Sequence, residues 1–355
     1  MGQKRVKICK EDGTEVDAVA PVILSVSRAT DIPAFYSEWF FKRLDSGYCC
    51  WRNPFNGIDS YVSFQNVRFI VFWSKNPAPL LPYLELLNEK GINGYVQYTL
   101  NDYESEGLEP GVPPLAQRIE TFKMLVEKLG KGRVVWRFDP MLLTDQIDIG
   151  VLLEKVSNIG DELKDYTEKL VFSFADISSY RKVKSNLEKN GINYIEWNEA
   201  LMTEFAGKLS AMKQDRGWNL KLATCGERID LAQYGIGHNR CVDDELISRI
   251  AWSDEALMEY LGIRLGSIER NIFGEDILPK GAWKVSESLY AIRIHGNSDS
   301  GQRQYCGCVS SKDIGAYNSC PHGCVYCYAN STPDSASKSF HLHNPLSESI
   351  SNSQN

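Results

Sequence analysis

Short runs of β-branched and aromatic residues recur along the chain, and segments with helical spacing of apolar positions separate them. Six of these runs are apolar enough to be buried on both faces, as the strands of parallel sheets are; they begin at Val22, Phe69, Gly94, Arg133, Lys169 and Asn219. The apolar spacing between them predicts helices over 35–44, 79–90, 114–129, 149–156 and 198–213. Six strand–helix units in one order predict an α/β fold, a partial (β/α)6 TIM-like parallel barrel.

The segments outside these units differ from them. An Asp12-Gly13 pair, which suits a tight turn, lies between two short strand-like runs, so we expect an N-terminal hairpin. Beyond the last strand, two short amphipathic segments predict helices with Asp243 and Ser253 as N-caps. The end of the polar, Ser-rich tail is expected to be disordered. The expected parts are the barrel with its hairpin, a helical region packed on it, a Cys-rich cluster-binding segment and the tail, over 1–229, 230–300, 301–331 and 332–355.

Polar residues follow the predicted strands, at the points where each strand ends and the next loop begins. In parallel barrels the chemistry sits at these carboxyl ends of the strands. Any one of these residues could simply cap a helix or tie a loop. Their recurrence predicts an active-site rim. Its members are Arg28, Asp31, Lys75, Asn76, Asn101, Asp102, Arg137, Asp139, Asp176, Cys225 and Glu227.

Composition limits the classes of protein. No run approaches the roughly 18 apolar residues of a membrane span, and the first residues lack the apolar stretch of a signal peptide. We therefore expect a cytoplasmic protein without a membrane partner, in which ten cysteines are metal ligands or catalytic thiols and not disulfides. A formal net charge of −7 argues against nonspecific coating of nucleic acid.

The strongest chemical signal is "CPHGCVYCYAN", in which Cys320, Cys324 and Cys327 have CxxxCxxC spacing. A cuboidal iron–sulfur cluster needs four ligands, so three cysteines leave one iron open to an exogenous ligand. A structural zinc ion needs a fourth protein ligand instead, which His322 or an upstream cysteine could supply. Spacing alone separates the two metals only loosely.

Four further cysteines form a second candidate group. Cys306 and Cys308 lie just upstream of the motif, Cys225 ends the last predicted strand, and Cys241 follows it. If the C-terminal segment folds onto the barrel mouth, the four sulfurs converge there and form a second site, an auxiliary [4Fe–4S] cluster or zinc. The alternative is that Cys225 and Cys241 are ordinary buried thiols. Burial is also the expectation for the remaining cysteines, which are Cys9, Cys49 and Cys50.

CxxxCxxC with an aromatic residue before the last cysteine resembles the signature loop of the radical S-adenosylmethionine enzymes, and "CVYCY" and "RFDP" are distantly similar to spore photoproduct lyase. Over nearly the whole length, "SRATDIPAFY", "FWSKNP" and the C-terminal cysteines are similar to an uncharacterised bacterial domain family with radical-SAM-type cysteines at its C-terminus. The superfamily resemblance implies a [4Fe–4S] cluster on Cys320, Cys324 and Cys327. It also implies S-adenosyl-L-methionine on the open iron, radical chemistry on an unknown substrate, and an electron donor such as a flavodoxin or ferredoxin.

The position of the motif departs from this superfamily, whose cysteine loop follows the first strand. Either the barrel is circularly permuted in effect, or the cysteines form a separate redox or zinc module. On the first reading, the catalytic residues are Arg28, Lys75, Arg137 and Asp139, and the cofactor-binding residues are Asp31, Asn76, Asn101 and Tyr326. On the second, the chain is a zinc- or iron–sulfur-containing structural, redox or nucleic-acid-related binding protein that does not cleave S-adenosylmethionine.

Overall fold

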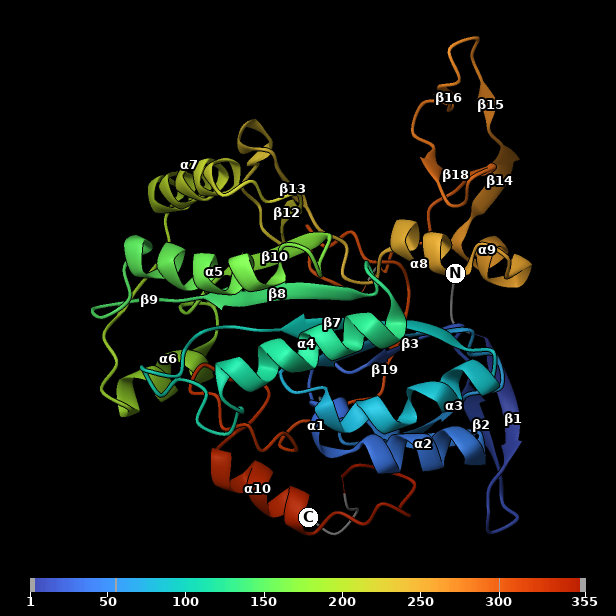
Figure 1. The fold of residues 1–355 in the computed structure, drawn as a ribbon. Helices are drawn as coiled ribbons and strands as arrows, with labels where there is room; N and C mark the ends of the chain where they lie inside the picture. The colour runs from blue at the N-terminus through green and yellow to red at the C-terminus, as the bar shows by residue number, and fades with distance from the viewer. Residues whose placement is uncertain (1–3, 55, 300, 352–355) are drawn as a thin grey trace.

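The computed structural model describes residues 4–54, 56–299 and 301–351, and an eight-stranded sheet forms its centre (Figure 1). The spatial order is β13-β12-β10-β8-β7-β6-β3-β19, and every neighbouring pair is parallel. The α/β class is therefore confirmed, and each of the six predicted strands is found. The strands are β3 (Ile23–Val26), β6 (Phe69–Ser74), β7 (Asn93–Thr99), β8 (Val134–Met141), β10 (Lys169–Phe174), β12 (Lys221–Thr224), β13 (Ile236–His238) and β19 (Lys312–Asp313).

The expected barrel is not confirmed. The edge strands β13 and β19 pair with β12 and β3 and not with each other, so the sheet is open within the described residues. Neither edge strand was predicted, because segments of three and two residues are too short to show a period. β19 lies parallel to the first strand of the sheet, although it comes almost last in the sequence.

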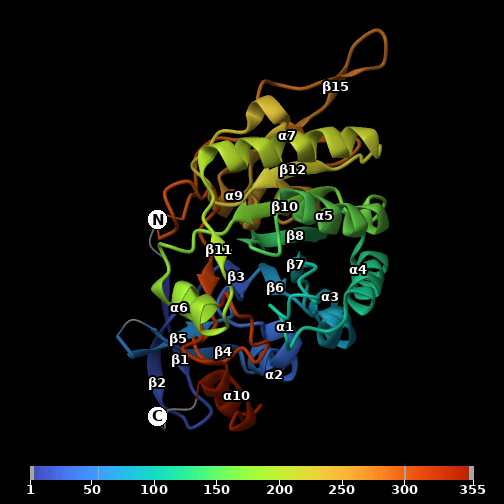
Figure 2. The same cartoon turned by 90° about the vertical axis from the view of Figure 1, so that its left-hand side faces the viewer.

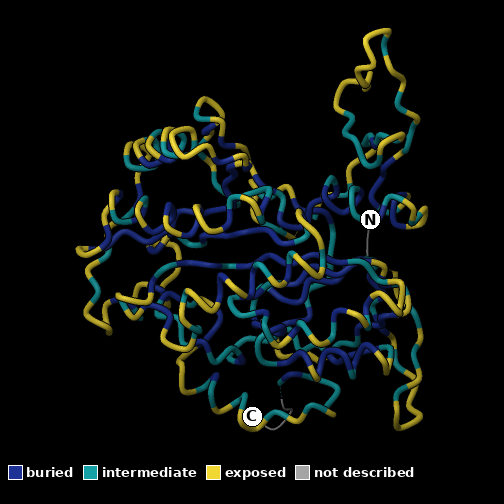
Figure 3. The backbone as a smooth tube through the Cα atoms, in the orientation of Figure 1, coloured by how far each residue is buried: buried dark blue, intermediate teal, exposed yellow. Residues whose placement is uncertain are grey.

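Helices cover both faces of the sheet (Figure 2). Alternate residues such as Leu24 and Phe72 pack with the helices that connect the strands, whereas Ile23 and Val71 belong to a second core with α8 and α9. The central strands are buried on both faces (Figure 3). The helices are α1 (Ile32–Phe35), α2 (Ser37–Ser46), α3 (Leu84–Glu89), α4 (Leu115–Leu129), α5 (Ile149–Leu163), α6 (Arg181–Lys189), α7 (Glu199–Asp215), α8 (Asp244–Ala251), α9 (Glu255–Leu261) and α10 (Pro333–His341), with 3₁₀ turns η1 (Ala78–Tyr83) and η2 (Ala232–Tyr234).

Smaller sheets, in which most neighbouring strands are antiparallel, lie around this centre. The predicted hairpin is confirmed as β1 (Arg5–Cys9) and β2 (Glu15–Val19), and β2 continues into β5 (Asp59–Ser63) and β4 (Tyr48–Arg52). The region expected to be helical also contains a projecting β arm (Figure 1). The strands of the arm and the remaining short pair are β14 (Ile263–Ser267), β15 (Glu269–Arg270), β16 (Asp276–Ile277), β17 (Trp283–Lys284), β18 (Leu289–Arg293), β9 (Leu143–Thr144) and β11 (Tyr194–Ile195).

One of the two predicted N-caps needs correction. Asp243 caps α8 as predicted, but α9 begins after Asp254 and not after Ser253, because the Asp254 carboxylate accepts from the Leu257 amide at 3.0 Å. The polar tail contains α10, and the Trp39 indole donates to the Ser347 carbonyl at 2.9 Å. The tail's last four residues, the part expected to be disordered, lie outside the described residues. No helix in the described chain is long and apolar enough to cross a membrane.

Close packing of α5 against Trp218 predicts an asymmetric response to glycine substitution. A Cβ on Gly160 would lie 2.1 Å from the Trp218 ring, whereas a Cβ on Gly207 in α7 would have its nearest contact at 3.4 Å. Gly160→Ala should lower the free energy of unfolding by about 1–3 kcal/mol through overpacking. Gly207→Ala should leave it unchanged or raise it by up to about 1 kcal/mol through helix propensity. Urea denaturation of both variants measures this, and equal effects would contradict the packing argument.

Asp244 at the start of α8 fastens the β arm, and this contact predicts acid sensitivity. Its carboxylate accepts from Arg293 of β18 at 2.5 and 2.9 Å and from Arg240 at 2.9 Å. Although burial raises it, these two guanidinium groups lower the pKa of Asp244 below its usual value. A lowered folded-state pKa gives stability that is present above about pH 4 and lost as the pH falls further. Asp244→Asn should therefore flatten the acid limb of the urea midpoint plotted against pH; an unchanged acid limb would contradict this.

Candidate functional site

The CxxxCxxC loop leaves the carboxyl end of β19. Asp313 holds that end against β3, since its carboxylate accepts from the Ser25 hydroxyl at 2.8 Å and from the Arg28 amide at 2.9 Å. Gly315 follows where the backbone passes so close that a Cβ would lie 1.8 Å from the Ser27 hydroxyl. The loop therefore starts next to the first strand of the sheet, at the edge where the predicted rim lies.

Loop residues before and between the cysteines are fixed to the segment after β3. The Thr30 hydroxyl lies 2.6 Å from the Ala316 carbonyl, and the Tyr36 hydroxyl donates to the Ser319 carbonyl at 2.6 Å. The Asn330 amide closes the loop by donating to the Cys320 carbonyl at 2.7 Å. The contacts of Thr30 and Tyr36 join residues almost 300 positions apart, so the loop is held as part of the sheet edge.

The three thiols of the motif are half-buried, and no sulfur–sulfur hydrogen bond joins Cys320, Cys324 and Cys327 among the described residues. Cys327 Sγ accepts from the Asn330 backbone amide at 3.4 Å. Burial raises the pKa of Cys320 to about 12 and that of Cys324 well above its usual value. Burial therefore disfavours the thiolate form of both, and the Lys75 ammonium opposes this effect at Cys324.

His322, inside the motif, is not free to bind a metal. One ring nitrogen lies 2.7 Å from the Asp31 carboxylate and the other 3.1 Å from the Gly111 carbonyl. Both partners offer acceptor oxygens, so both ring nitrogens are occupied by contacts within the protein. Asp31 is fully engaged as well, because it also accepts from the Ser74 hydroxyl and the Lys75 amide at 2.6 and 2.7 Å. The pair thus positions the loop.

Lys75 and Tyr326 belong to one buried polar network. The Lys75 ammonium lies 2.7 Å from a Glu109 carboxylate oxygen and 3.0 Å from the Tyr326 hydroxyl, and the Asn101 amide donates to the same two groups. Although burial raises it, Lys75 and Arg118 lower the pKa of Glu109 to about 2. Tyr326 also donates to Glu109. The network joins two of the predicted strand ends to the cysteine loop.

Arg137 and Asp139, also predicted, form a second buried polar group. The Arg137 guanidinium pairs with Asp139, which accepts in addition from the Ser173 hydroxyl. The Asn101 amide oxygen accepts from the Asp139 backbone amide at 2.8 Å, which connects this group to the Lys75 network. Polar side chains therefore form a continuous hydrogen-bonded path over the ends of β6, β7, β8 and β10.

Arg28 and Trp73 hold donors that lack partners. The Trp73 ring lies between two guanidinium groups, with Arg28 at 5.0 Å and Arg137 at 5.3 Å from its centre. Arg28 Nη2 and Trp73 Nε1 are buried and have no hydrogen-bond partner in the described chain. Buried donors are almost always satisfied in folded proteins, so a ligand with acceptor atoms fits here.

The second group of cysteines also converges. The Cys225 and Cys241 sulfurs are 3.3 Å apart, and side-chain hydrogen bonds link Cys241 to Cys308 and Cys308 to Cys306. The hydrogen bond from Cys308 lowers the pKa of Cys306 to about 7. As the side chains stand, no three Cys, His, Asp or Glu groups among the described residues have the arrangement of a metal site.

Three further findings concern Asn76, the cysteines outside both groups, and a residue that the sequence did not indicate. Asn76 lies at the end of β6, where its amide donates to the Ser74 hydroxyl at 2.9 Å. Cys49 and Cys50 are buried as expected, but Cys9 is exposed, which corrects that expectation. Glu109 was missed because it lies in the long loop after β7, where its charge looks like ordinary surface polarity in the sequence.

Comparison with known proteins gives a family and no activity. No curated protein and no solved structure matched the chain. A family model described as "Domain of unknown function (DUF1848)" matches residues 23–329, a range that begins at β3 and includes the whole cysteine loop to Ala329. The chain therefore belongs to the DUF1848 family of proteins with a domain of unknown function.

Proposed function

We propose that this protein is a radical S-adenosylmethionine enzyme, with a [4Fe–4S] cluster on Cys320, Cys324 and Cys327. The observation that carries the proposal is the pairing of β19 with β3. Through this pairing β19 becomes an edge strand beside β3, and the cysteine loop follows it directly. A strand followed by the cysteine loop is the arrangement expected of this superfamily. The motif therefore comes near the end of the sequence but lies next to the first strand of the sheet. This position favours a circularly permuted arrangement over a separate redox or zinc module.

The donor set fits a cluster with one open iron. The three thiols lie within one eight-residue stretch of the loop, and both ring nitrogens of His322 within that stretch are occupied by Asp31 and Gly111. A structural zinc ion would need a fourth ligand at this place. When bound, the cluster would supply the electron that cleaves the sulfonium of S-adenosylmethionine and so starts radical chemistry on the substrate.

The chain's own residues would compensate charge and hold the cofactor. Lys75 brings a positive charge close to Cys324. Burial lowers the pKa of Lys75, but the charges of Glu109 and, to a lesser extent, Cys324 raise it above its usual value. The unpartnered donors on Arg28 and Trp73 suit the carboxylate of a bound amino acid. Arg137 and Asp139 would orient the substrate or the ribose from the neighbouring strand end.

Cofactor cleavage is the direct test. Full-length protein is purified and reconstituted anaerobically, reduced with dithionite and incubated with S-adenosylmethionine, and 5′-deoxyadenosine is quantified by mass spectrometry. We expect release that depends on both reductant and bound iron. Iron without any cofactor cleavage would favour a structural or redox cluster, and zinc in place of iron at these cysteines would reject the proposal.

A further inference from the structure

A second metal site, separate from the CxxxCxxC loop, is indicated by Cys225, Cys241, Cys306 and Cys308. We propose that these four cysteines bind one zinc ion as a structural tetrathiolate site. Their thiols come from three distant parts of the sequence, the end of β12, the segment after β13 and the segment before β19. The proposal does not depend on the iron–sulfur proposal, because it uses none of the same ligands.

Sulfur spacing favours a single ion over a second cluster. Cys225 Sγ and Cys241 Sγ lie 3.3 Å apart, and the thiols of Cys241, Cys308 and Cys306 continue as a chain of side-chain hydrogen bonds. Tetrahedral zinc with Zn–S distances of about 2.3 Å places neighbouring sulfurs about 3.8 Å apart. In a [4Fe–4S] cluster each cysteine binds a different iron, so the cluster itself keeps the cysteine sulfurs farther apart.

Side-chain hydrogen bonds already link the four thiols to one another. Zinc binding would replace the thiol hydrogens of these contacts. Four thiols are converted to four thiolates around Zn²⁺, with the protons released to solvent.

Donors around the sulfurs match a thiolate site. Cys308 Sγ accepts from two consecutive backbone amides, those of Cys241 and Val242, at 3.2 and 3.3 Å. The Arg137 guanidinium donates to Cys241 Sγ at 3.0 Å, and the Asn239 amide donates to the same sulfur at 3.3 Å. A tetrathiolate zinc centre carries a net negative charge, which the buried Arg137 compensates. Such outer contacts orient metal ligands and tune their affinity.

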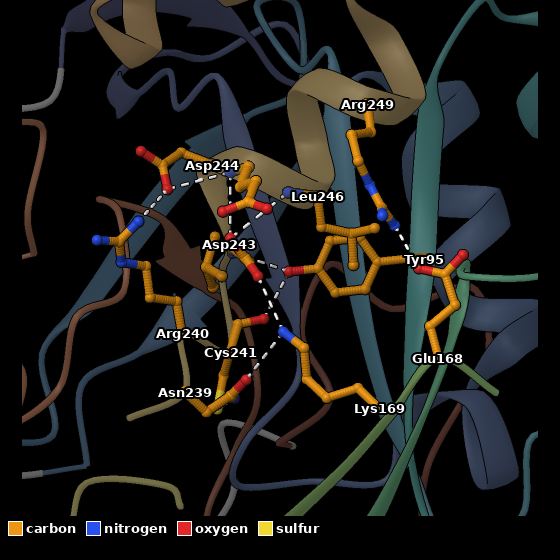
Figure 4. Close-up of polar contacts among 12 residues, drawn as sticks. Tyr95, Glu168, Lys169, Asn239, Arg240, Cys241, Asp243, Asp244, Leu246 and Arg249 are labelled. Carbon is orange, nitrogen blue, oxygen red and sulfur yellow. Dashed lines mark hydrogen bonds and ion pairs between the residues drawn. The ribbon is translucent and has the colours of Figure 1, made fainter. Parts of the chain in front are cut away.

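The segment that carries Cys241 is rigid before any metal binds. Figure 4 shows the Tyr95 hydroxyl donating to the Cys241 carbonyl at 2.5 Å and accepting from the Asp243 amide at 3.0 Å. Lys169 pairs with Asp243 at 3.1 Å and also contacts Asn239. Both sides of Cys241 are thus tied to central strands, so one wall of the site is preformed.

The location gives the site a structural role. Cys308 precedes β19 by only four residues, and the Val309 amide donates to the Val242 carbonyl at 3.0 Å. An ion bound here would fasten the C-terminal segment to β12 and to the segment after β13. The C-terminal segment then supplies β19 at the opposite edge of the sheet. The ion would thereby fix the strand from which the CxxxCxxC loop starts.

Metal analysis of the full-length protein tests the proposal. We expect about one zinc per chain in wild type, its loss in Cys308→Ala, and its retention in Cys324→Ala and in Cys50→Ala, which removes a buried thiol elsewhere. Zinc retained in Cys324→Ala while iron is lost separates this site from the iron–sulfur proposal. If Cys308→Ala does not fold, zinc K-edge EXAFS of wild type decides, with four sulfur neighbours at about 2.3 Å expected.

Several results would overturn the inference. Wild-type protein without zinc would do so, as would zinc with nitrogen or oxygen neighbours. Loss of about four irons and no zinc from Cys308→Ala would identify a second iron–sulfur cluster instead. A Cys225–Cys241 disulfide in peptide maps of anaerobically alkylated protein would replace the metal site with a redox pair.

Discussion

Cys324→Ala is expected to lose nearly all bound iron and all release of 5′-deoxyadenosine. Two thiols remain in the loop of this variant, and His322 is not available as a substitute because both of its ring nitrogens already contact Asp31 and Gly111. Iron and acid-labile sulfide, counted per chain after anaerobic reconstitution, should fall from about four to near zero.

Cys50→Ala is the matched control, since Cys50 is a buried thiol on β4 outside both cysteine groups. It should keep its full iron content and its activity. Equal iron in wild type and Cys324→Ala would remove Cys324 from the ligand set. Equal loss in both variants would point to general unfolding.

Asp31→Asn is expected to destabilise the protein strongly and to loosen the cysteine loop. An asparagine can still accept from the Ala34 amide, so the helix cap at α1 survives. The His322 ring, however, loses the buried carboxylate that it contacts at 2.7 Å. Breaking one partner of a buried ion pair costs about 3–5 kcal/mol, and we expect that loss in the free energy of unfolding measured with urea.

Asp148→Asn is the control that measures the effect of the same substitution at a helix cap alone. Asp148 caps α5 by accepting from the Val151 amide at 2.9 Å, the same type of contact that Asp31 makes to Ala34. Aspartate and asparagine cap helices about equally well, so this variant should change stability by less than about 0.5 kcal/mol. A similar cost at both positions would show that the contact between Asp31 and His322 adds nothing to stability.

The long elements of the fold could be predicted from the sequence, because their periods are clear. The apolar runs at Phe69 and Lys169 gave central strands, and the helix ending before Gly130 was found with its predicted end. Position in the sheet could not be predicted for β19. Its two residues, Lys312 and Asp313, have no apolar pattern, and their pairing with β3 depends on contacts almost 300 residues apart in the sequence.

Part of the candidate site could likewise be predicted from the sequence, and part could not. Strand ends and cysteine spacing identified Lys75, Asn101 and Tyr326, which the structure brings into one network. Glu109, the carboxylate at its centre, lies in a loop without a strand or motif to mark it. Asp31 was expected to bind a cofactor, whereas its oxygens are occupied within the protein. Spacing shows which groups lie near the site but not which partners they find.

The most direct measurement is the EPR spectrum of the reduced, reconstituted protein before and after addition of S-adenosylmethionine. The central claim is an iron that Cys320, Cys324 and Cys327 leave open to the cofactor. It predicts a cluster signal whose g-values change when the cofactor is added. It also predicts that Cys324→Ala shows no such signal. A cluster signal that is unchanged by S-adenosylmethionine would contradict the claim and leave a structural or redox cluster.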